Sequence, residues 1–68
     1  MNEDKFNLEL RKFLKKVGIS SQREIEKAIR SAIEQGRLSG DETVSVSATL
    51  ELPELGTRET ITGTIALE

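Results

Sequence analysis

The sequence predicts an α+β fold in which a two-helix hairpin packs on one face of a C-terminal antiparallel β-hairpin, in the order ααββ. Apolar residues recur at helical spacing through the first half of the chain, and from Thr43 onward they alternate with polar residues. Glycine or a Pro–Gly pair separates the successive segments. A chain of 68 residues is long enough for one domain, expected to span residues 1–68.

The first helix is expected at about residues 3–17. Its apolar stripe consists of Phe6, Leu10, Phe13, Leu14 and Val17. Acidic residues occupy the first turn, and Lys15 and Lys16 would occupy the last turn, where positive charge is favourable against the helix dipole. Gly18 would then take the left-handed conformation that ends the helix.

The second helix is expected at about residues 21–35. With Ser21 as the N-cap, Glu24 falls at the third helical position, which is a capping-box arrangement. The inward stripe would consist of Ile25, Ala28, Ile29, Ala32 and Ile33. Gly36 would end this helix.

Two strands are expected at about residues 43–52 and 58–67, joined by a turn at "PELG" in which Pro53 fixes φ and Gly56 supplies a permissive position. Matching apolar residues across the strands places Leu50 opposite Ile61 and Ala48 opposite Gly63. The helix pair is expected to lie across the shallow saddle at this second pair.

The composition argues against most enzyme chemistry. The chain has no cysteine, histidine or tyrosine, so the commonest general bases, nucleophiles and transition-metal ligands are missing. No glycine-rich phosphate loop or patterned calcium loop is present. We therefore expect a non-enzyme with no metal or cofactor. The lack of cysteine and of long apolar runs further predicts a cytoplasmic protein that does not bind membranes.

Charge is distributed unevenly along the chain. Residues 1–40 carry nine basic and six acidic residues, a net charge of +3, whereas residues 41–68 carry one basic and six acidic residues, a net charge of −5. The candidate interaction surface on the helices consists of Leu8, Arg11, Lys12, Lys15, Lys16, Arg23 and Lys27. Leu8 lies off the apolar stripe among bases and is expected to be exposed. The alternative is an ordinary solvated face whose lysines serve the helix dipole.

Residues 17–36 also match the pattern of a helix-turn-helix, with the second helix as the recognition helix and the β-hairpin as a wing. Nucleic-acid binding is therefore an alternative function. The missing third helix, the mixed charge of the second helix and the acidic hairpin argue against it.

The β-hairpin offers a second candidate surface, because both strands of a two-stranded sheet are edges and neither carries a protecting lysine. The candidate contact residues at these edges are Ser45, Ser47, Thr49, Thr60, Thr62 and Thr64. Such strands suit a homodimer or the extended segment of a protein partner. The favoured function is thus a small non-catalytic protein-interaction or adaptor module, acting through a sheet edge or the basic helix face.

Four stretches, "MNEDKFN", "RKFLKKVGISSQREIEKAI", "GRLSGDE" and "GTIALE", resemble a family of short bacterial proteins known only as a domain of unknown function. The resemblance covers most of the chain. It implies a small bacterial cytosolic protein and no particular activity. The terminal Leu67–Glu68 is either native or a cloning remnant.

Overall fold

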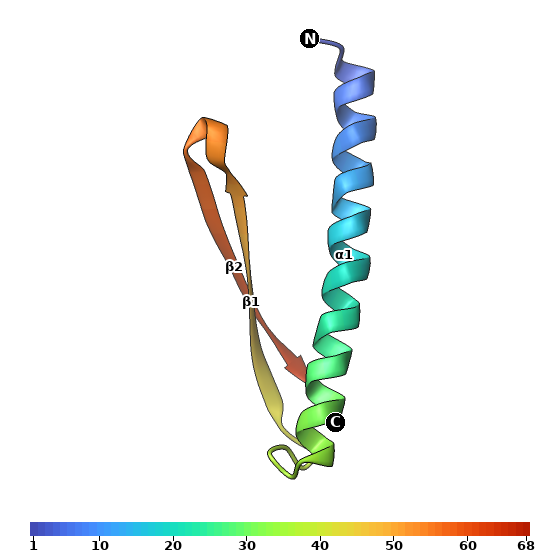
Figure 1. Ribbon diagram of the computed structural model, residues 1–68, viewed down its shortest axis with the longest axis vertical. Coiled ribbons are helices and arrows are strands. Elements are labelled where there is room, and N and C mark those ends of the chain that lie inside the picture. The colour runs from blue at the N-terminus through green and yellow to red at the C-terminus, as the bar shows by residue number, and fades with distance from the viewer. The chain divides into compact units, whose positions relative to one another are not determined.

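The computed structural model describes all 68 residues, in the order α1 (Glu3–Glu34), β1 (Thr43–Leu52), a short 3₁₀ helix η1 (Pro53–Leu55) and β2 (Thr57–Ala66) (Figure 1). The α+β class and the β-hairpin are confirmed. The chain divides into two compact units, Met1–Arg37 and Leu38–Glu68, and each is described by itself. The expected packing of helices on the hairpin therefore stays a prediction.

The first unit is a single helix of 32 residues, so the prediction of two helices at 3–17 and 21–35 was wrong. Gly18 does not adopt positive φ, and Ser21 lies inside the helix rather than at its start. Glycine and serine lower helix propensity by about 1 kcal/mol or less each. A break would instead leave up to four C=O groups without partners at the end of the preceding segment and up to four N–H groups without partners at the start of the following one. Continuing the helix keeps those hydrogen bonds.

Both ends of α1 are closed by local hydrogen bonds. At the start, the Asn2 side-chain oxygen accepts a hydrogen bond from the Lys5 N–H at 3.0 Å. At the end, Gly36 has φ of 75°, and the Arg37 N–H donates to the Ala32 carbonyl at 2.8 Å. This is the Schellman arrangement, so the prediction that Gly36 ends the helix is confirmed.

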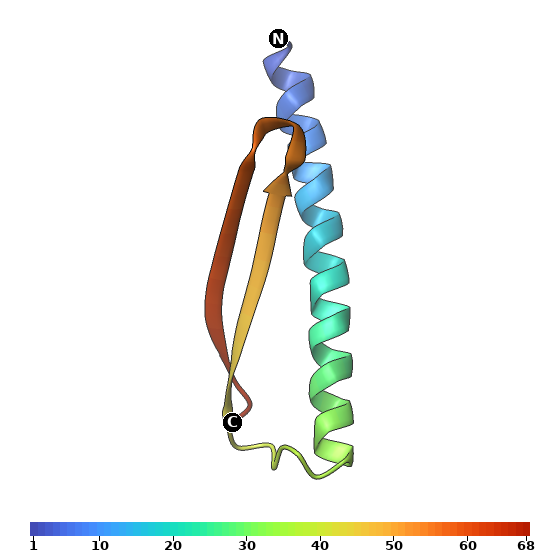
Figure 2. The same ribbon diagram turned by 60° about the vertical axis from the view of Figure 1, so that its left-hand side comes forward.

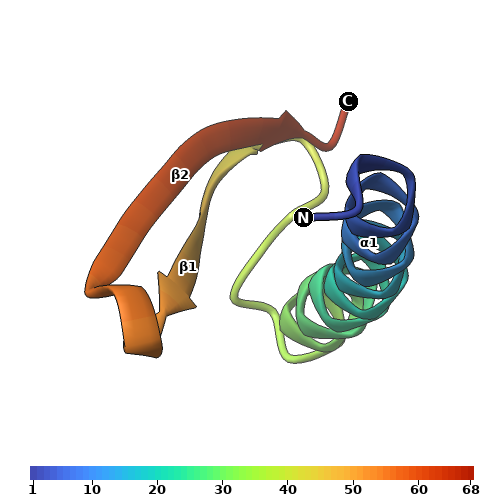
Figure 3. The same ribbon diagram turned by 90° about the horizontal axis from the view of Figure 1, so that it is seen from above.

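The second unit is a two-stranded antiparallel hairpin whose tip is η1 and Gly56 (Figures 2 and 3). Gly56 has φ of 65°, which confirms the predicted turn at "PELG". The predicted register was wrong by two residues, because Ala48 lies opposite Ile61 and Val46 opposite Gly63. A four-residue connection over residues 53–56 places Leu52 opposite Thr57, and that pair determines every other pair in the ladder.

Burial is slight along the whole chain. Ala32, at 8% exposure, is the one buried residue, although Ile25 and Ile29 on α1 are half-buried. In the hairpin, the half-buried side chains of the strands are Val44, Val46 and Ile65, which lie where β1 begins and β2 ends. The stripe from Phe6 to Val17, which was expected to face a core, is exposed.

Candidate functional site

The apolar stripe of α1 changes direction partway along the helix. At about 100° per residue, the stripe of Phe6–Val17 and that of Ile25–Ile33 are centred about 80° apart on the helix surface. Glu24 falls on the line of the first stripe, where it interrupts the apolar surface. The two stripes that suggested two helices therefore belong to neighbouring sides of one helix.

A separate basic face lies on the opposite side of the N-terminal half of α1. We use this name for Leu8, Arg11, Lys12, Lys15, Lys16 and Ile19. Leu8, Lys12, Lys15 and Ile19 are spaced by three or four residues, so they follow one another along one side of the helix. Lys12, Lys15, Lys16, Ile19 and Ser20 line a shallow hollow on this side.

The apolar members of the basic face are strongly exposed. Leu8 is 57% and Ile19 52% exposed, which confirms the expectation for Leu8. Ile19 lies in the middle of α1, rather than in a turn between two helices, and its side chain is exposed. Its place beside Lys12 and Lys16 follows only once the helix is known to be continuous.

The charges of the basic face have no partner within the chain. The one ion pair in the structure joins Arg58 Nε to Glu51 Oε1 at 3.8 Å, in the hairpin. Arg11–Lys15 and Lys12–Lys16 are like-charge pairs four residues apart, and each such pair destabilises a helix by about 0.2–0.5 kcal/mol. The last turn of α1 contains no basic residue, so Lys15 and Lys16 do not serve the helix dipole as expected.

The other predicted basic residues, Arg23 and Lys27, lie further along α1 among acidic neighbours. Next to these two residues, Gln22 Nε2 donates a hydrogen bond to Glu26 Oε1 at 2.9 Å. The helix-turn-helix that would have presented them to a DNA groove is not formed, because residues 17–21 are helical. A recognition helix set at an angle to a preceding helix therefore has no counterpart here.

The six predicted edge residues pair with one another across the hairpin: Ser45 with Thr64, Ser47 with Thr62 and Thr49 with Thr60. The Leu67 N–H donates to the Glu42 carbonyl at 2.9 Å, which marks that pair as hydrogen-bonded. Because hydrogen-bonded and non-hydrogen-bonded pairs alternate, the three Ser/Thr pairs are non-hydrogen-bonded, and their main-chain N–H and C=O groups face outward at the two edges.

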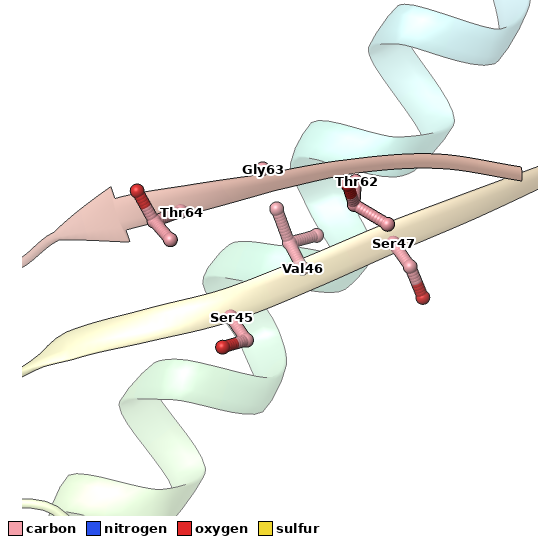
Figure 4. Close-up of a pocket in the computed structure, with 6 residues that line it drawn as sticks. All are labelled: Ser45, Val46, Ser47, Thr62, Gly63 and Thr64. Carbon is pink, nitrogen blue, oxygen red and sulfur yellow. The ribbon is translucent and has the colours of Figure 1, made fainter.

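The hydroxyl side chains of these pairs surround a shallow hollow in the middle of the hairpin, lined by Ser45, Val46, Ser47, Thr62, Gly63 and Thr64 (Figure 4). Gly63 contributes no side chain, and a Cβ built there would lie 3.8 Å from Val46 Cγ1. The nearest hydroxyl contact, Thr49 Oγ1 to Thr60 Oγ1, measures 3.5 Å. No charged side chain lines this hollow, so its side chains offer hydroxyl hydrogen bonds and apolar contacts.

Glu42 forms a local structure that the sequence reasoning missed. Its carboxylate accepts hydrogen bonds from the Ser39 N–H at 2.7 Å and the Gly40 N–H at 2.9 Å. These bonds hold the pKa of Glu42 below its ordinary value. Gly40 has φ of 105°, so the pattern S-G-D-E was a signal for a tight turn held by an acidic side chain.

The remaining findings describe the chain as a whole. No group of three or more His, Cys, Asp or Glu side chains is arranged to hold a metal ion. Apolar residues are too few in α1 for this helix to cross a bilayer.

No curated protein and no solved structure matches the chain. A family model, described as a family of unknown function (DUF6494), matches residues 1–68, and the chain therefore belongs to this family.

Proposed function

We propose that this protein is a small cytoplasmic, non-catalytic protein-interaction module whose main contact surface is helix α1. The single observation that carries the proposal is the presence of large exposed apolar side chains on two opposite sides of one helix. Phe13 belongs to one side and is 51% exposed, while Leu8 and Ile19 belong to the other. One packed layer covers one side of a helix, so a single surface cannot cover both.

The unpaired charges of the basic face support the same function. Four positive charges within residues 11–16 repel one another and have no acidic partner on the helix. An acidic protein surface would relieve this repulsion, and it would also cover Leu8 and Ile19. The sheet edges are a second contact surface, since each strand presents outward main-chain groups that an extended segment can pair with.

The proposal is tested by photo-crosslinking inside the cells that make the protein. A photoreactive amino acid replaces Leu8 in one variant and Glu26 in a control variant. Position 26 is eighteen residues further on, about five turns, and therefore lies on the same side of α1 but outside the basic face. We expect covalent protein adducts from position 8 and few from position 26. Equal labelling at both positions, or none at either, would contradict the proposal.

Nucleic-acid binding is the second candidate, and the observation that favours it is the same run of exposed, unpaired bases. It is distinguished by salt, because binding to phosphates weakens steeply as salt concentration rises. In an amide-resolved NMR titration with mixed-sequence DNA and RNA, the amide resonances of Arg11 and Lys15 would shift at low salt. At physiological salt they would return to their positions in the free protein. An unchanged spectrum at low salt would eliminate this candidate and leave the protein-interaction proposal intact.

A further inference from the structure

We infer that the basic face of α1 binds the hairpin tip of a second copy of this chain, an inference that rests on the proposed function. The hairpin tip is defined here as Glu54, Leu55 and Glu59. In a two-fold symmetric dimer each copy would supply one basic face and one hairpin tip, which makes two equivalent contacts.

The hairpin tip carries a strongly exposed apolar residue. Leu55 is 73% exposed, more than any other large apolar side chain except Met1. It lies in η1, where Pro53 and the left-handed Gly56 hold the turn. A single leucine on this turn matches the basic face, where Leu8 and Ile19 are separated by about three helical turns with lysines between them.

The hairpin tip and the basic face also carry opposite charges. Glu51 is paired with Arg58, so Glu54 and Glu59 are the acidic residues near the tip that have no ion-pair partner. The whole second unit carries a net charge of −5 over residues 38–68, against +3 over residues 1–37. Apolar residues surrounded by acids on one surface and by bases on the other give two surfaces that attract each other and repel their own kind.

A second copy of the chain supplies the tip that covers the basic face. A chain has one hairpin, and α1 has exposed apolar residues on two opposite sides. Whatever covers the stripe of Phe6–Val17, the basic face on the other side needs another surface. A second copy brings an identical acidic tip at equal concentration, without requiring any further protein.

The test exchanges the charges of the two surfaces. The face variant is Lys12→Glu, Lys15→Glu and Lys16→Glu, and the tip variant is Glu54→Lys and Glu59→Lys. We expect the natural protein to be a dimer by light scattering and sedimentation. Each variant alone should dimerise at least about tenfold more weakly, because its own face and tip then carry the same charge. Mixed in equal amounts, the two variants should form a heterodimer, because both of its contacts are again complementary.

Two controls keep this test specific. A variant with Lys27→Glu, Arg30→Glu and Arg37→Glu has the same net charge as the face variant but an intact basic face. It should dimerise like the natural protein, and it should not form a full-strength heterodimer with the tip variant. Circular dichroism confirms that each variant keeps its helix.

The outcomes separate the inference from the proposed function. A natural protein that stays monomeric at millimolar concentration overturns the inference. A mixture of the face variant and the tip variant that stays monomeric also overturns it. So does a result in which stability is restored only in a chain that carries both sets of changes. Crosslinks from position 8 to a different protein would then still support the interaction function, whereas crosslinks between two copies support both.

Discussion

Gly18 is the residue whose backbone conformation distinguishes one long helix from two short ones. Its φ is not positive, and a Cβ added there would meet nothing within 4 Å. We predict that Gly18→Ala raises the free energy of unfolding by about 1 kcal/mol, because alanine costs less conformational entropy than glycine inside a helix. Chemical denaturation at fixed protein concentration measures the change. A helix that ended at residue 18 would be destabilised by the same substitution.

Gly36 is the matched control for this substitution. It also has open space around it, but its φ of 75° lies in the left-handed region. We predict that Gly36→Ala lowers the free energy of unfolding by about 1–2 kcal/mol, since an alanine there clashes with its own backbone. Opposite signs at the two glycines would show that one is inside a helix and the other ends it.

Glu42 provides the pH-dependent prediction at this scale. Its pKa is lowered by the hydrogen bonds from the Ser39 and Gly40 N–H groups. A group whose pKa is lower in the folded state contributes stability above its unfolded pKa, and this contribution is lost as pH falls through the folded pKa. We predict that the Ser39 and Gly40 amide resonances move together on acidification, with a midpoint below that of an unfolded peptide of the same sequence.

The substitution Glu42→Gln separates charge from hydrogen bonding at this turn. Glutamine keeps one oxygen acceptor but has no charge, so both amides should exchange with solvent faster and lose their response to acid. A normal titration midpoint in the natural protein would contradict the assignment of Glu42 as the acceptor.

At the scale of the element, the continuity of α1 predicts a long distance between residues near its two ends. Because the chain contains no cysteine, spin labels can be attached at Lys5→Cys and Arg30→Cys without background. A continuous helix places these backbone sites about 38 Å apart. A hairpin of two packed helices would bring them within about 15 Å. Pulsed electron paramagnetic resonance measures the distance, and a short value would restore the two-helix arrangement.

The β-hairpin predicts different effects of proline at two adjacent positions. The N–H of Ser47 faces outward at the edge, so Ser47→Pro should keep the hairpin and its Hα–Hα contact with Thr62. Ala48 belongs to a hydrogen-bonded pair, so Ala48→Pro should remove a ladder bond and the cross-strand contacts. NMR measures both.

The register of this hairpin could have been predicted from its turn. Matching apolar residues placed Leu50 opposite Ile61, but the predicted four-residue turn over Pro53–Gly56 already required Leu52 opposite Thr57. A shift of two residues keeps every side chain on the same face, so alternation cannot distinguish the two registers. Turn length distinguishes them. The observed register leaves Leu50 opposite Glu59 and Ile61 strongly exposed.

At the scale of the whole molecule, association predicts that stability depends on concentration. Dimerisation favours the folded state by mass action, so Tm should rise as protein concentration rises. We predict that Leu55→Ser removes this dependence while leaving Tm at low concentration nearly unchanged, because Leu55 is exposed. Differential scanning calorimetry over a hundredfold concentration range measures both effects. Thr57→Ser, at another exposed residue beside the turn, serves as the control.

The predicted basic surface agrees with the structure only in part, for a physical reason. The positions of Arg11, Lys12, Lys15 and Lys16 on one side of a helix follow from their spacing and hold in either a short or a long helix. Whether these positions explain the basic residues depends on the length of the helix. In a helix ending at Val17, Lys15 and Lys16 would lie in the last turn and favour the dipole, whereas in α1 they lie near its middle and lack that explanation.

The sequence by itself determined where α1 begins and ends, where the spacing changes from helical to alternating, and where the hairpin turns. Each of these depends on local chemistry: acidic residues in a first turn, left-handed glycines at residues 36 and 56, and a proline before a short connection. Only the tertiary structure decided that the helix continues through Gly18–Ser21, which register the strands adopt, and which apolar side chains stay exposed. In those cases the local preferences differ by about 1–2 kcal/mol or not at all, so hydrogen bonding and packing over longer distances select the outcome.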